Sequence, residues 1–313
     1  MEPEQRPCDA TIIVVSFNTR ALTLECLASI YRESTALSFE VIVVDNASSD
    51  GSAAAIAESF PDLALHALER NLGFGAANNL AAADARGEFL VLLNPDTRVT
   101  DDAVGAIVRH ARSLPAPGII GGRTLFADGT LNPTSCWGAP GLWSTFCRAA
   151  CLSSLFPRSA LFDPTSLGRW QRDTEREVGV VSGCFLLIPR ALWRRLDGFD
   201  EAFFMYGEDV DLALRAKQLG FGSRITPTAT VVHVGAASER VRADKLMRLM
   251  GAHRRIMRKH WSRPRAALGL RLHAAGVLAR VVGARLLRRL PRAGRFSGAA
   301  VWIEVWRRRS EWR

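Results

Sequence analysis

The chain has 313 residues, of which 48% are hydrophobic and 23% charged, enough for one large α/β domain with an appendage and a core that needs no metal or disulfide. Its net charge of +10 is uneven, because residues 1–234 carry 20 Lys and Arg against 27 Asp and Glu, whereas residues 235–313 carry 21 against 4. The acidic larger part argues against a nucleic-acid-binding protein, and the six cysteines, with no C-x-x-C pair or His cluster, argue against a zinc site.

Three apolar strands, each followed by a helical pattern, come first after a polar, acidic segment at 1–9 that lacks the features of a signal peptide. We expect a cytoplasmic, reducing setting for such a chain. The strands are predicted at Thr11–Phe17, Phe39–Val44 and Leu63–Leu68, and the clearest helices at Ala53–Phe60 and the alanine-rich Ala76–Ala85.

A fourth strand, Leu90–Leu93, ends abruptly at Asn94-Pro95-Asp96. Proline has no N–H to donate to a neighbouring strand, so strand pairing must stop there. The Asp96 carboxylate would then stand at the carboxyl end of a buried strand, where open α/β sheets bind their ligands. It suits Mg²⁺ or Mn²⁺ and, through the metal, a diphosphate. The alternative is an Asp that starts a turn or caps the helix predicted at Asp102–Ser113.

These four β-then-α units predict a parallel, doubly wound sheet. Polar side chains follow the ends of all four strands, and parallel strands end at the same edge of a sheet. Any one of these residues could be structural, but together they predict a single crevice. They are Ser16 and Asn18, Asp45 and Asn46, Arg70 and Asn71, and Asn94 and Asp96.

The regular alternation ends beyond Pro115, and residues 115–235 are expected to form the acceptor side of the site. Within them, Ile119–Phe126 and Val178–Pro189 are predicted strands, and two further short strands precede His233. The intervening stretch Asp128–Arg176 is rich in Pro, Gly, Ser and Trp and has no clear periodicity. Such a stretch could hold an acceptor or simply cover the surface.

Three carboxylates, Glu208, Asp209 and Asp211, crowd the first turn of a predicted helix that runs to Leu219. Acids at that place compensate the helix dipole, which is the structural explanation. Aromatic residues precede them, however, and a carboxylate beside apolar rings can have a raised pKa and act as a general base. His233 ends an apolar strand and could return to the same crevice as a second ligand for Mn²⁺.

The glycines at positions 73 and 75 do not form a dinucleotide-binding fingerprint. The segment Gly73–Asn78 ends in Asn where that fingerprint has Gly or Ala, and it follows the third strand instead of the first. No Walker A sequence and no G-x-S-x-G occurs in the chain. These observations exclude the NAD(P)-dependent and ATP-hydrolysing interpretations.

With these residues assembled, the chain resembles the family 2 inverting glycosyltransferases of the GT-A fold, and among them the bacterial rhamnosyltransferase-like branch, over residues 10–235. The resemblance implies a GT-A type α/β fold, a doubly wound and mostly parallel sheet flanked by helices, for a nucleotide-sugar-binding and catalytic domain at 1–235. It is carried, in order, by Ser16–Asn18, Val43–Ser52, Asn71–Asn79, Leu92–Asp96, Gly198–Glu201 and Glu208–Asp211.

The resemblance also implies roles for the donor-side residues. Asp45 would hydrogen-bond the nucleotide base. Ser16, Asn18 and the loop Asn71–Asn79, which includes Gly73, would surround the base and ribose.

Further roles follow at the metal and the base. Asn94-Pro95-Asp96 stands where the family has its D-x-D metal motif, so Asp96 would be the chief ligand of Mn²⁺ or Mg²⁺ and Asn94 a neutral helper. His233 matches the position that joins the metal in some relatives. Asp209 matches the base that deprotonates the acceptor hydroxyl, and Glu208 would contact the nucleotide-sugar beside it.

The implied activity is an inverting, metal-dependent transfer of a sugar, L-rhamnose from dTDP-rhamnose, onto a saccharide or lipid-linked acceptor in cell-surface polysaccharide assembly. Inversion needs a single in-line attack, hence one base and no enzymic nucleophile, while a divalent metal stabilises the leaving diphosphate. The alternatives are another donor, such as a UDP-hexose or a galactofuranose nucleotide, and a nucleotide-sugar-binding protein without turnover.

Residues 236–313 are a basic extension with helices predicted at Glu239–Trp261, Arg265–Leu290 and Ala299–Trp312. In the middle helix apolar residues recur at spacings of four and three from Leu268 to Leu286, and no uncharged run exceeds eight residues. We therefore expect it, within 264–313, to lie on the anionic inner face of the cell membrane and not to span it. Nucleic acid binding and a simple helical cap are the alternatives.

Overall fold

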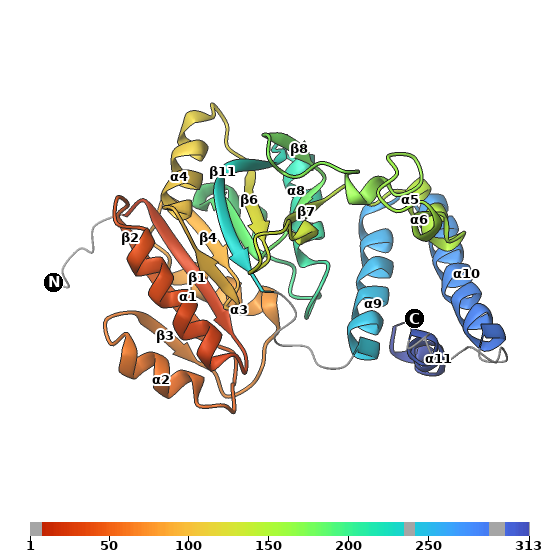
Figure 1. Cartoon of the computed structure of the whole chain (residues 1–313), viewed down its shortest axis with the longest axis horizontal. Helices are drawn as coiled ribbons and strands as arrows, with labels where there is room; N and C mark the ends of the chain where they lie inside the picture. Colours follow the sequence, from red (N-terminus) through yellow and green to blue (C-terminus); the bar gives the residue numbers. More distant parts are fainter. Residues whose placement is uncertain (1–7, 235–241, 288–297, 313) are drawn as a thin grey trace. The chain divides into compact units, whose positions relative to one another are not determined.

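The computed structural model describes residues 8–234, 242–287 and 298–312, and the chain divides into two compact units (Figure 1). The long stretch after Trp137 groups with the C-terminal helices and not with the sheet. All six cysteines are free thiols. Unit 1 consists of Met1–Trp137 and Gln171–Ser238, and unit 2 of Gly138–Trp170 and Glu239–Arg313.

Unit 1 is built on a nine-stranded sheet in the order β3-β2-β1-β4-β10-β6-β11-β5, with β8 paired to β11 outside this path. The first four strands in this order are parallel, β10 runs antiparallel to both of its neighbours, and β11 is parallel to β6. The strands are β1 (Ala10–Ser16), β2 (Phe39–Asp45), β3 (Ala64–Ala67), β4 (Phe89–Leu93), β5 (Thr97–Val99), β6 (Ile119–Leu125), β8 (Arg176–Val178), β10 (Phe185–Pro189) and β11 (Ser223–His233), and the pair β7 (Cys136–Trp137) and β9 (Val180–Val181) forms a separate small sheet.

Helices pack against this sheet, and the expected α/β fold is confirmed. The helices of unit 1 are α1 (Arg20–Glu33), α2 (Ser52–Ser59), α3 (Phe74–Asp84), α4 (Ala103–Ser113), α7 (Arg190–Leu196) and α8 (Glu208–Gln218), with a 3₁₀ turn at Pro133–Ser135. Ile12 and Val14 of β1 belong to the main core together with α1 and α4. The alternate residue Ile13 is also fully buried, and α3 packs on β1, so both faces of the strand are covered.

Several short elements differ from the sequence expectations. The strand β5 follows the Asn94–Asp96 turn at once and pairs with the end of β11. The two strands expected before His233 are one strand, with a register shift between Thr226 and Thr230. The stretch Asp128–Arg176, expected to be irregular, contains two helices of unit 2. These elements are set by pairing and packing over long distances, which local periodicity does not report.

Unit 2 is helical. Its helices are α5 (Leu142–Ala149), α6 (Leu152–Leu155), α9 (Arg242–His260), α10 (Arg263–Leu287) and α11 (Gly298–Arg307), with 3₁₀ turns at Pro164–Ser166 and Arg309–Glu311. Met247 and Met250 of α9 pack with Val277 and Val281 of α10 and with Val305 of α11 to form a small core. The three helices expected after residue 238 are thus present among the described residues, while the expected ends at 239–241 and 288–290 lie outside them.

The apolar stripe expected in the middle C-terminal helix is present in α10, but it faces away from that core, since Leu268 and Val282 are exposed. By length and composition alone, the stretch Arg263–Arg285 is long and apolar enough to cross a membrane. The prediction that α10 does not span a bilayer rested only on the length of its uncharged runs. The overall composition of the helix does not support that prediction. A core helix of a soluble protein meets the same criterion.

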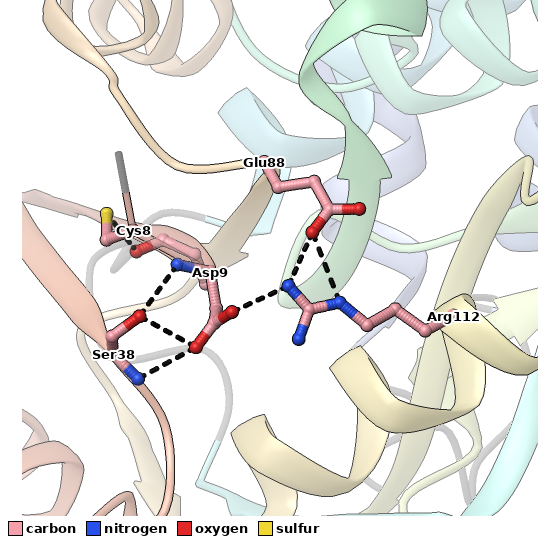
Figure 2. A network of polar contacts seen from close by, with 6 residues as sticks. Cys8, Asp9, Ser38, Glu88 and Arg112 are labelled. Carbon is pink, nitrogen blue, oxygen red and sulfur yellow. Dashed lines mark hydrogen bonds and ion pairs between the residues drawn. The ribbon is translucent and has the colours of Figure 1, made fainter. Parts of the chain in front are cut away.

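A polar network ties the amino ends of β1 and β4 to α4 (Figure 2). Arg112 of α4 donates to Asp9 Oδ1 at 2.6 Å and, through Nε, to Glu88 Oε2 at 3.1 Å. Asp9 Oδ2 in turn accepts hydrogen bonds from the Ser38 hydroxyl at 2.7 Å and the Ser38 N–H at 3.0 Å. These bonds, first those from Ser38 and then that from Arg112, lower the pKa of Asp9 to about 2. The network holds the sheet together at the edge opposite the polar strand ends.

We expect Asp9→Asn to lower the free energy of unfolding by about 1 kcal/mol at neutral pH, because it removes charge-assisted hydrogen bonds at a partly exposed site. The folded-state pKa lies below the ordinary value of 3.8, so this stabilisation is complete above that value and is lost as pH falls through about 2. Urea unfolding of both chains from neutral to acidic pH measures the difference, with Glu58→Gln in α2 as a control. A difference that does not shrink on acidification would contradict the assignment.

Candidate active site

The polar ends of the first strands lie at one edge of the sheet, as their pattern predicts. β1, β2 and β4 are parallel, with Ser16 beside Asp45 and Val14 beside Leu93. The chain therefore leaves all three strands at the same edge, which is the ligand-binding edge of an open α/β sheet. This places the Asp45 carboxylate and the Asn94–Asp96 turn on that edge, with the end of β1 between them.

Asp45 presents an unused acceptor there. It is the last residue of β2, and it is 2% exposed. Its Oδ1 accepts a hydrogen bond from the Ser48 N–H at 2.9 Å, whereas its Oδ2 is buried and has no hydrogen-bond partner within the described residues. A buried carboxylate oxygen without a donor is costly, so this atom is suited to a ligand that brings an N–H or O–H.

Ser16 and Asn18 support the loop that follows β2. The Ser16 hydroxyl is fully buried against the Thr23 hydroxyl at 2.9 Å, and the Ser16 carbonyl accepts a hydrogen bond from the Asn46 N–H at 2.8 Å. Asn18 has a φ of +52°, and its Oδ1 accepts a hydrogen bond from the Ser49 N–H at 2.8 Å. Ser16 thus lies beneath the site, while Asn18 lies at its exposed rim.

Asn46 joins this loop to the turn before α3. Its Nδ2 donates to the Gly73 carbonyl at 3.1 Å, and its Oδ1 accepts from the Leu72 N–H at 2.8 Å. Asn71 Oδ1 accepts from the Gly73 N–H at 2.8 Å, which orders the same turn. Gly73 has a φ of +86°, and a Cβ there would lie 2.1 Å from the Phe204 carbonyl oxygen, so this position requires glycine.

The turn before α3 is also tied to the segment that carries the predicted base. The Phe74 N–H donates to the Phe204 carbonyl at 3.0 Å. The Asn79 side chain bonds both backbone groups of Phe199, because Oδ1 accepts from its N–H at 2.8 Å and Nδ2 donates to its carbonyl at 2.9 Å. The Asn79 amide therefore connects α3 to the segment that follows α7.

Asp96 and His233, distant along the chain, meet at this edge. The pairing of β5 with β11 sets His233 opposite Thr97. Asp96 Oδ1 then lies 3.2 Å from His233 Nε2, with both side chains 9% exposed, and Asn94 Nδ2 lies 3.4 Å from the same ring nitrogen. Asn132, just after β6, holds the other side of the histidine, since its Nδ2 lies 3.4 Å from Nδ1 and donates to the His233 carbonyl at 3.0 Å.

The donor atoms at this point fit a hard divalent cation. One carboxylate and one imidazole converge, which suits Mn²⁺, while Mg²⁺ commonly takes one or two carboxylates together with substrate phosphates and water. Within the described part of the chain, no group of three or more His, Cys, Asp or Glu side chains could hold a metal. The remaining ligands would therefore come from a bound diphosphate and from water.

The turn between β9 and β10 brings the two halves of the site together. The Asn94 N–H donates to the Cys184 carbonyl at 3.0 Å, so this turn lies directly beside the Asn94–Asp96 turn. Burial raises the pKa of the Cys184 thiol to about 12, and the negative charges of Asp96 and Asp209 both act in the same direction. Because the neighbouring Gly183 N–H hydrogen-bonds the Asp209 carboxylate, this one turn contacts both halves of the site.

Asp209 and Glu208 are a coupled pair at the start of α8. Burial raises the pKa of Asp209 above the ordinary carboxyl value, and the N–H groups of Val210 and Gly183, which hydrogen-bond its carboxylate, oppose the shift only in part. Burial, and next the charge of Asp209, raise the pKa of Glu208 as well. Glu208 Oε2 is buried with no hydrogen-bond partner among the residues that the structure describes. The two N–H groups favour the ionised form of Asp209, whereas Glu208 Oε2 has no donor to support a charge.

Asp211, the third carboxylate of this turn, is structural. It is fully buried and forms an ion pair with Arg215 one turn along α8, at 2.7 Å. Arg215 also donates to the Gly198 carbonyl at 2.8 Å, which fixes the connection between α7 and α8. Of the three acids, only Glu208 and Asp209 are left for chemistry.

Three residues support the site, of which the sequence indicated Asn46 only as one of the polar strand ends and did not indicate Asn132 or Cys184. Asn46 and Asn132 are almost fully buried amides whose hydrogen bonds bridge loops from different strands, and the Cys184 carbonyl accepts a hydrogen bond from the Asn94 N–H. The only signal for Asn46 was its place after β2. Asn132 lies in the stretch without periodicity and Cys184 in an apolar run predicted as a strand, so nothing local marked either as a site residue.

Comparison with known proteins agrees with this geometry. The model of the family described as "Glycosyl transferase family 2" matches residues 11–192. The chain is 33% identical over 211 residues to an N-acetylglucosaminyl-diphospho-decaprenol L-rhamnosyltransferase of Mycobacterium tuberculosis, a match that covers 63% of this chain and 67% of that protein. It is 26% identical over 201 residues to the rhamnosyltransferase WbbL of Escherichia coli, which covers 60% of this chain and 71% of that protein.

Solved structures show the same fold at low identity. A mannosyltransferase from Pyrobaculum calidifontis, in complex with GDP-Man and Mn²⁺, superposes with a TM-score of 0.55 at 19% identity and covers 97% of this chain and 87% of its own. Residues 1–349 of TarS from S. aureus give a TM-score of 0.52 at 16% identity, covering 95% of this chain and 78% of that one. These likenesses confirm the expected GT-A type fold.

Proposed function

Because this chain belongs to glycosyl transferase family 2, we propose that it is an inverting enzyme that moves L-rhamnose from dTDP-rhamnose onto a saccharide or lipid-linked acceptor in cell-surface polysaccharide assembly. The observation that carries the reaction type is that one turn, Gly183-Cys184, is hydrogen-bonded both to Asn94, next to the predicted metal ligand Asp96, and to the Asp209 carboxylate. The names of the two rhamnosyltransferase relatives support the sugar, and the diphospho-decaprenol in one of those names supports a lipid-linked acceptor.

The reaction needs one base and one leaving diphosphate. The acceptor hydroxyl oxygen attacks the anomeric carbon as the bond from that carbon to the diphosphate oxygen breaks, and the leaving group takes the bonding electron pair. The acceptor proton passes to Asp209, which leaves a nucleoside diphosphate and a glycoside of inverted configuration. A single displacement needs no carboxylate as a nucleophile, and Asp211 is held in an ion pair by Arg215.

The donor half is assigned to the strand ends. Asp45 Oδ2, buried and without a partner among the described residues, would accept a hydrogen bond from the base. Asn18 and the turn that contains Asn71 and Gly73 would border the ribose, with Asn46 and Ser16 holding both loops in place. Asn79 would act indirectly, because its side chain bonds Phe199 and so connects the donor half to the acceptor-side segment.

Asp96 and His233 would hold Mn²⁺ or Mg²⁺, with Asn94 as a neutral neighbour. The cation supplies positive charge to the diphosphate as negative charge grows on the leaving oxygen. Asn132 keeps the His233 ring in place by its bonds to the ring and to the backbone.

Glu208 stands beside the base as a neutral acid. Burial raises its pKa, and its Oε2 has no donor among the described residues, so a protonated Glu208 would donate a hydrogen bond to the nucleotide-sugar without repelling the diphosphate. A second negative charge at this place would also disfavour ionisation of Asp209.

We place the reaction on the cytoplasmic side of the cell membrane. The free thiols of all six cysteines fit a reducing compartment, and a lipid-linked acceptor would be presented at the membrane surface. We do not propose a nucleic acid as a partner, because residues 1–234 are acidic overall.

The proposal is tested by measuring the melting temperature of the full chain with dTDP-rhamnose, UDP-glucose, a UDP-galactofuranose and GDP-mannose, each with Mn²⁺ or Mg²⁺ and with neither. We expect dTDP-rhamnose with a metal to stabilise most, by about 2.7 kcal/mol at a hundredfold excess over its dissociation constant. Transfer to an N-acetylglucosaminyl-diphospho-polyprenol, followed by NMR of the anomeric centre, then reports the product and its configuration.

Each contrary outcome removes a different part of the proposal. Stronger stabilisation by another donor would replace the sugar but keep the reaction. Retention of configuration would remove the single displacement and the role of Asp209 as a base. Donor binding with no transfer and no donor hydrolysis would favour a binding protein without turnover.

A further inference from the structure

The side of α10 that points away from unit 2 is apolar. We define the outer face of α10 by its five exposed apolar residues. Leu268, Leu278 and Val282 are 49%, 45% and 46% exposed. They are joined by two exposed alanines at the same helical spacing, Ala275 and Ala279.

The opposite side of α10 is already occupied. Val277 and Val281 pack into the core of unit 2 with residues of α9 and α11, and a Cβ at Gly276 would lie 2.7 Å from the Cα of Ala149 in α5. Arg280 secures this packing by donating to the Arg148 carbonyl at 2.8 Å. The helix is therefore apolar on both sides, although only one side has a protein partner among the described residues. Helices that are apolar all round are found inside proteins or in lipid.

Other exposed apolar side chains gather in the same unit. Of the fourteen large hydrophobic residues that are exposed among the residues described, eight lie in unit 2, which is the smaller unit. On α5, Trp143 stacks on Phe146 with ring centroids 5.5 Å apart, and its indole N–H donates to the Leu161 carbonyl at 2.6 Å. Three further apolar residues of unit 2 are 50–68% exposed, namely Leu155, Phe156 and Leu161.

The charge of unit 2 indicates what covers this surface. Residues 138–170 and 239–313 carry 24 Lys and Arg against five Asp and Glu. Two of these cations, Arg271 and Arg285, are exposed on α10 itself, on the same side as its apolar residues. An apolar helix face bordered by arginines is complementary to a bilayer with anionic head groups, which offers hydrocarbon and negative charge together.

We propose that unit 2 docks on an anionic membrane through the outer face of α10, which lies along the surface with Leu268, Leu278 and Val282 in the lipid. We propose that the helix lies on the membrane and does not cross it. Its inner side carries the buried His273 and also Arg280, which donates to the Arg148 carbonyl of α5. Crossing the bilayer would separate these polar groups from the rest of unit 2. This inference does not depend on the sugar, the metal or the base.

The experiment is co-sedimentation of the full chain with vesicles of phosphatidylcholine alone or mixed with phosphatidylglycerol, at low salt. The test variant is Leu268→Glu/Leu278→Glu/Val282→Glu on the outer face of α10. The matched control is Leu80→Glu/Phe126→Glu/Leu219→Glu, which replaces three exposed apolar residues of unit 1. Both variants lower the net charge by the same amount, so only the position of the change differs. Circular dichroism of all three chains checks that they are folded.

We expect the intact chain to bind the mixed vesicles much better than phosphatidylcholine alone, and the α10 variant to lose about tenfold or more of that binding. The unit 1 variant should stay close to the intact chain. The proposal is overturned if the intact chain remains in the supernatant with the mixed vesicles, or if the folded α10 variant binds like the intact chain. Equal loss in both variants would show that net charge alone acts, which also overturns it.

A second copy of the chain is the other occupant to be tested. Size-exclusion chromatography with light scattering gives the mass of the intact chain and of the α10 variant. A dimer that the α10 variant converts to a monomer, without vesicle binding by the intact chain, would assign the face to self-association and end the membrane proposal. Because none of these readouts is catalytic, a failure here leaves the proposed function untouched.

Discussion

Asp209→Asn is expected to lower sugar transfer by about 10²–10⁴-fold, which is the usual contribution of a well-placed general base. Donor binding should change little, because Asp209 faces the acceptor hydroxyl in the proposed reaction and Asn has almost the same shape. Steady-state transfer and donor calorimetry on the same protein separate the two effects. Glu177→Gln, a change at a 78% exposed carboxylate in β8, is the control and should transfer normally. Near-normal transfer by Asp209→Asn would remove the base assignment.

The same residue should set the acidic limb of the pH profile. A base must be ionised to accept a proton, so kcat/KM falls as pH is lowered through the pKa of Asp209 in the free enzyme. Burial raises that pKa above 3.8, so the limb should lie well above the ordinary range of an Asp side chain. A limb near pH 4 would mean that a solvated carboxylate, and not Asp209, is the group being titrated.

Asp209→Asn should also make the folded chain more stable in neutral and mildly alkaline solution. A pKa that is higher in the folded than in the unfolded chain means that folding is favoured below the unfolded value, and that this advantage is lost as pH rises through the folded value. Asn carries no charge to bury, so the variant avoids that loss. One pKa unit corresponds to about 1.4 kcal/mol, and 1 kcal/mol to a melting shift of about 2–4 °C in a domain of this size. Calorimetry should find the two chains converging below about pH 4.

Asp96→Ala is expected to weaken Mn²⁺ binding strongly and to lower transfer on the order of 10²–10³-fold, as the loss of one group that stabilises developing negative charge does in other enzymes. The side chain is 9% exposed beside His233, and no third His, Cys, Asp or Glu within the described residues can replace it. Mn²⁺ titration followed by electron paramagnetic resonance, with a non-transferable nucleoside diphosphate present, measures the metal without activity.

Asn94→Asp is the informative partner of that variant. Asn94 Nδ2 already lies 3.4 Å from the ring nitrogen that faces Asp96, so a carboxylate there would add a charged ligand at the same place. We expect tighter Mn²⁺ binding than in the natural chain. If Asp96→Ala bound Mn²⁺ normally, or if Asn94→Asp left the affinity unchanged, the metal would have to lie elsewhere.

The part of the site that follows strand ends could be predicted from the sequence. Asp45 and Asp96 each follow an apolar run, and parallel pairing alone brings such residues to one edge, so their closeness required no knowledge of the loops. The approach of His233 to Asp96 was also predicted, although the strand that produces it, β5, was not. A strand of three residues gives no periodic signal and exists only because β11 is beside it.

The sequence indicated some polar residues near the site but not which groups their side chains bond. Asn79 was predicted to lie near the nucleotide, yet its amide is bonded to Phe199. Ser16 was predicted to touch the ligand, whereas its hydroxyl is closed off by Thr23. Their roles toward a bound nucleotide-sugar stay predictions. The direction of a short polar side chain depends on which loop folds over it, and nothing in the local pattern records that.

The grouping of residues 138–170 with the C-terminal helices could not be predicted either. Their composition is that of a surface loop, and the contact that joins them to α10 depends on the absence of a side chain at Gly276. A single glycine in an alanine-rich helix is not distinctive in one sequence. The spacing of apolar residues predicted an apolar face on α10. It could not predict whether that face packs inside unit 2 or is exposed.

The hydrogen bond from Phe74 to the Phe204 carbonyl has a practical meaning for anyone who wishes to retarget this protein. This bond joins the loop that would bind the donor to the segment that precedes the proposed base, Asp209. We therefore expect that neither segment can be replaced by that of a relative on its own. A chimera that takes residues 71–75 from a relative should therefore also take residues 199–206 from that relative. Otherwise we expect the packing between the two segments to be lost before the donor selectivity changes.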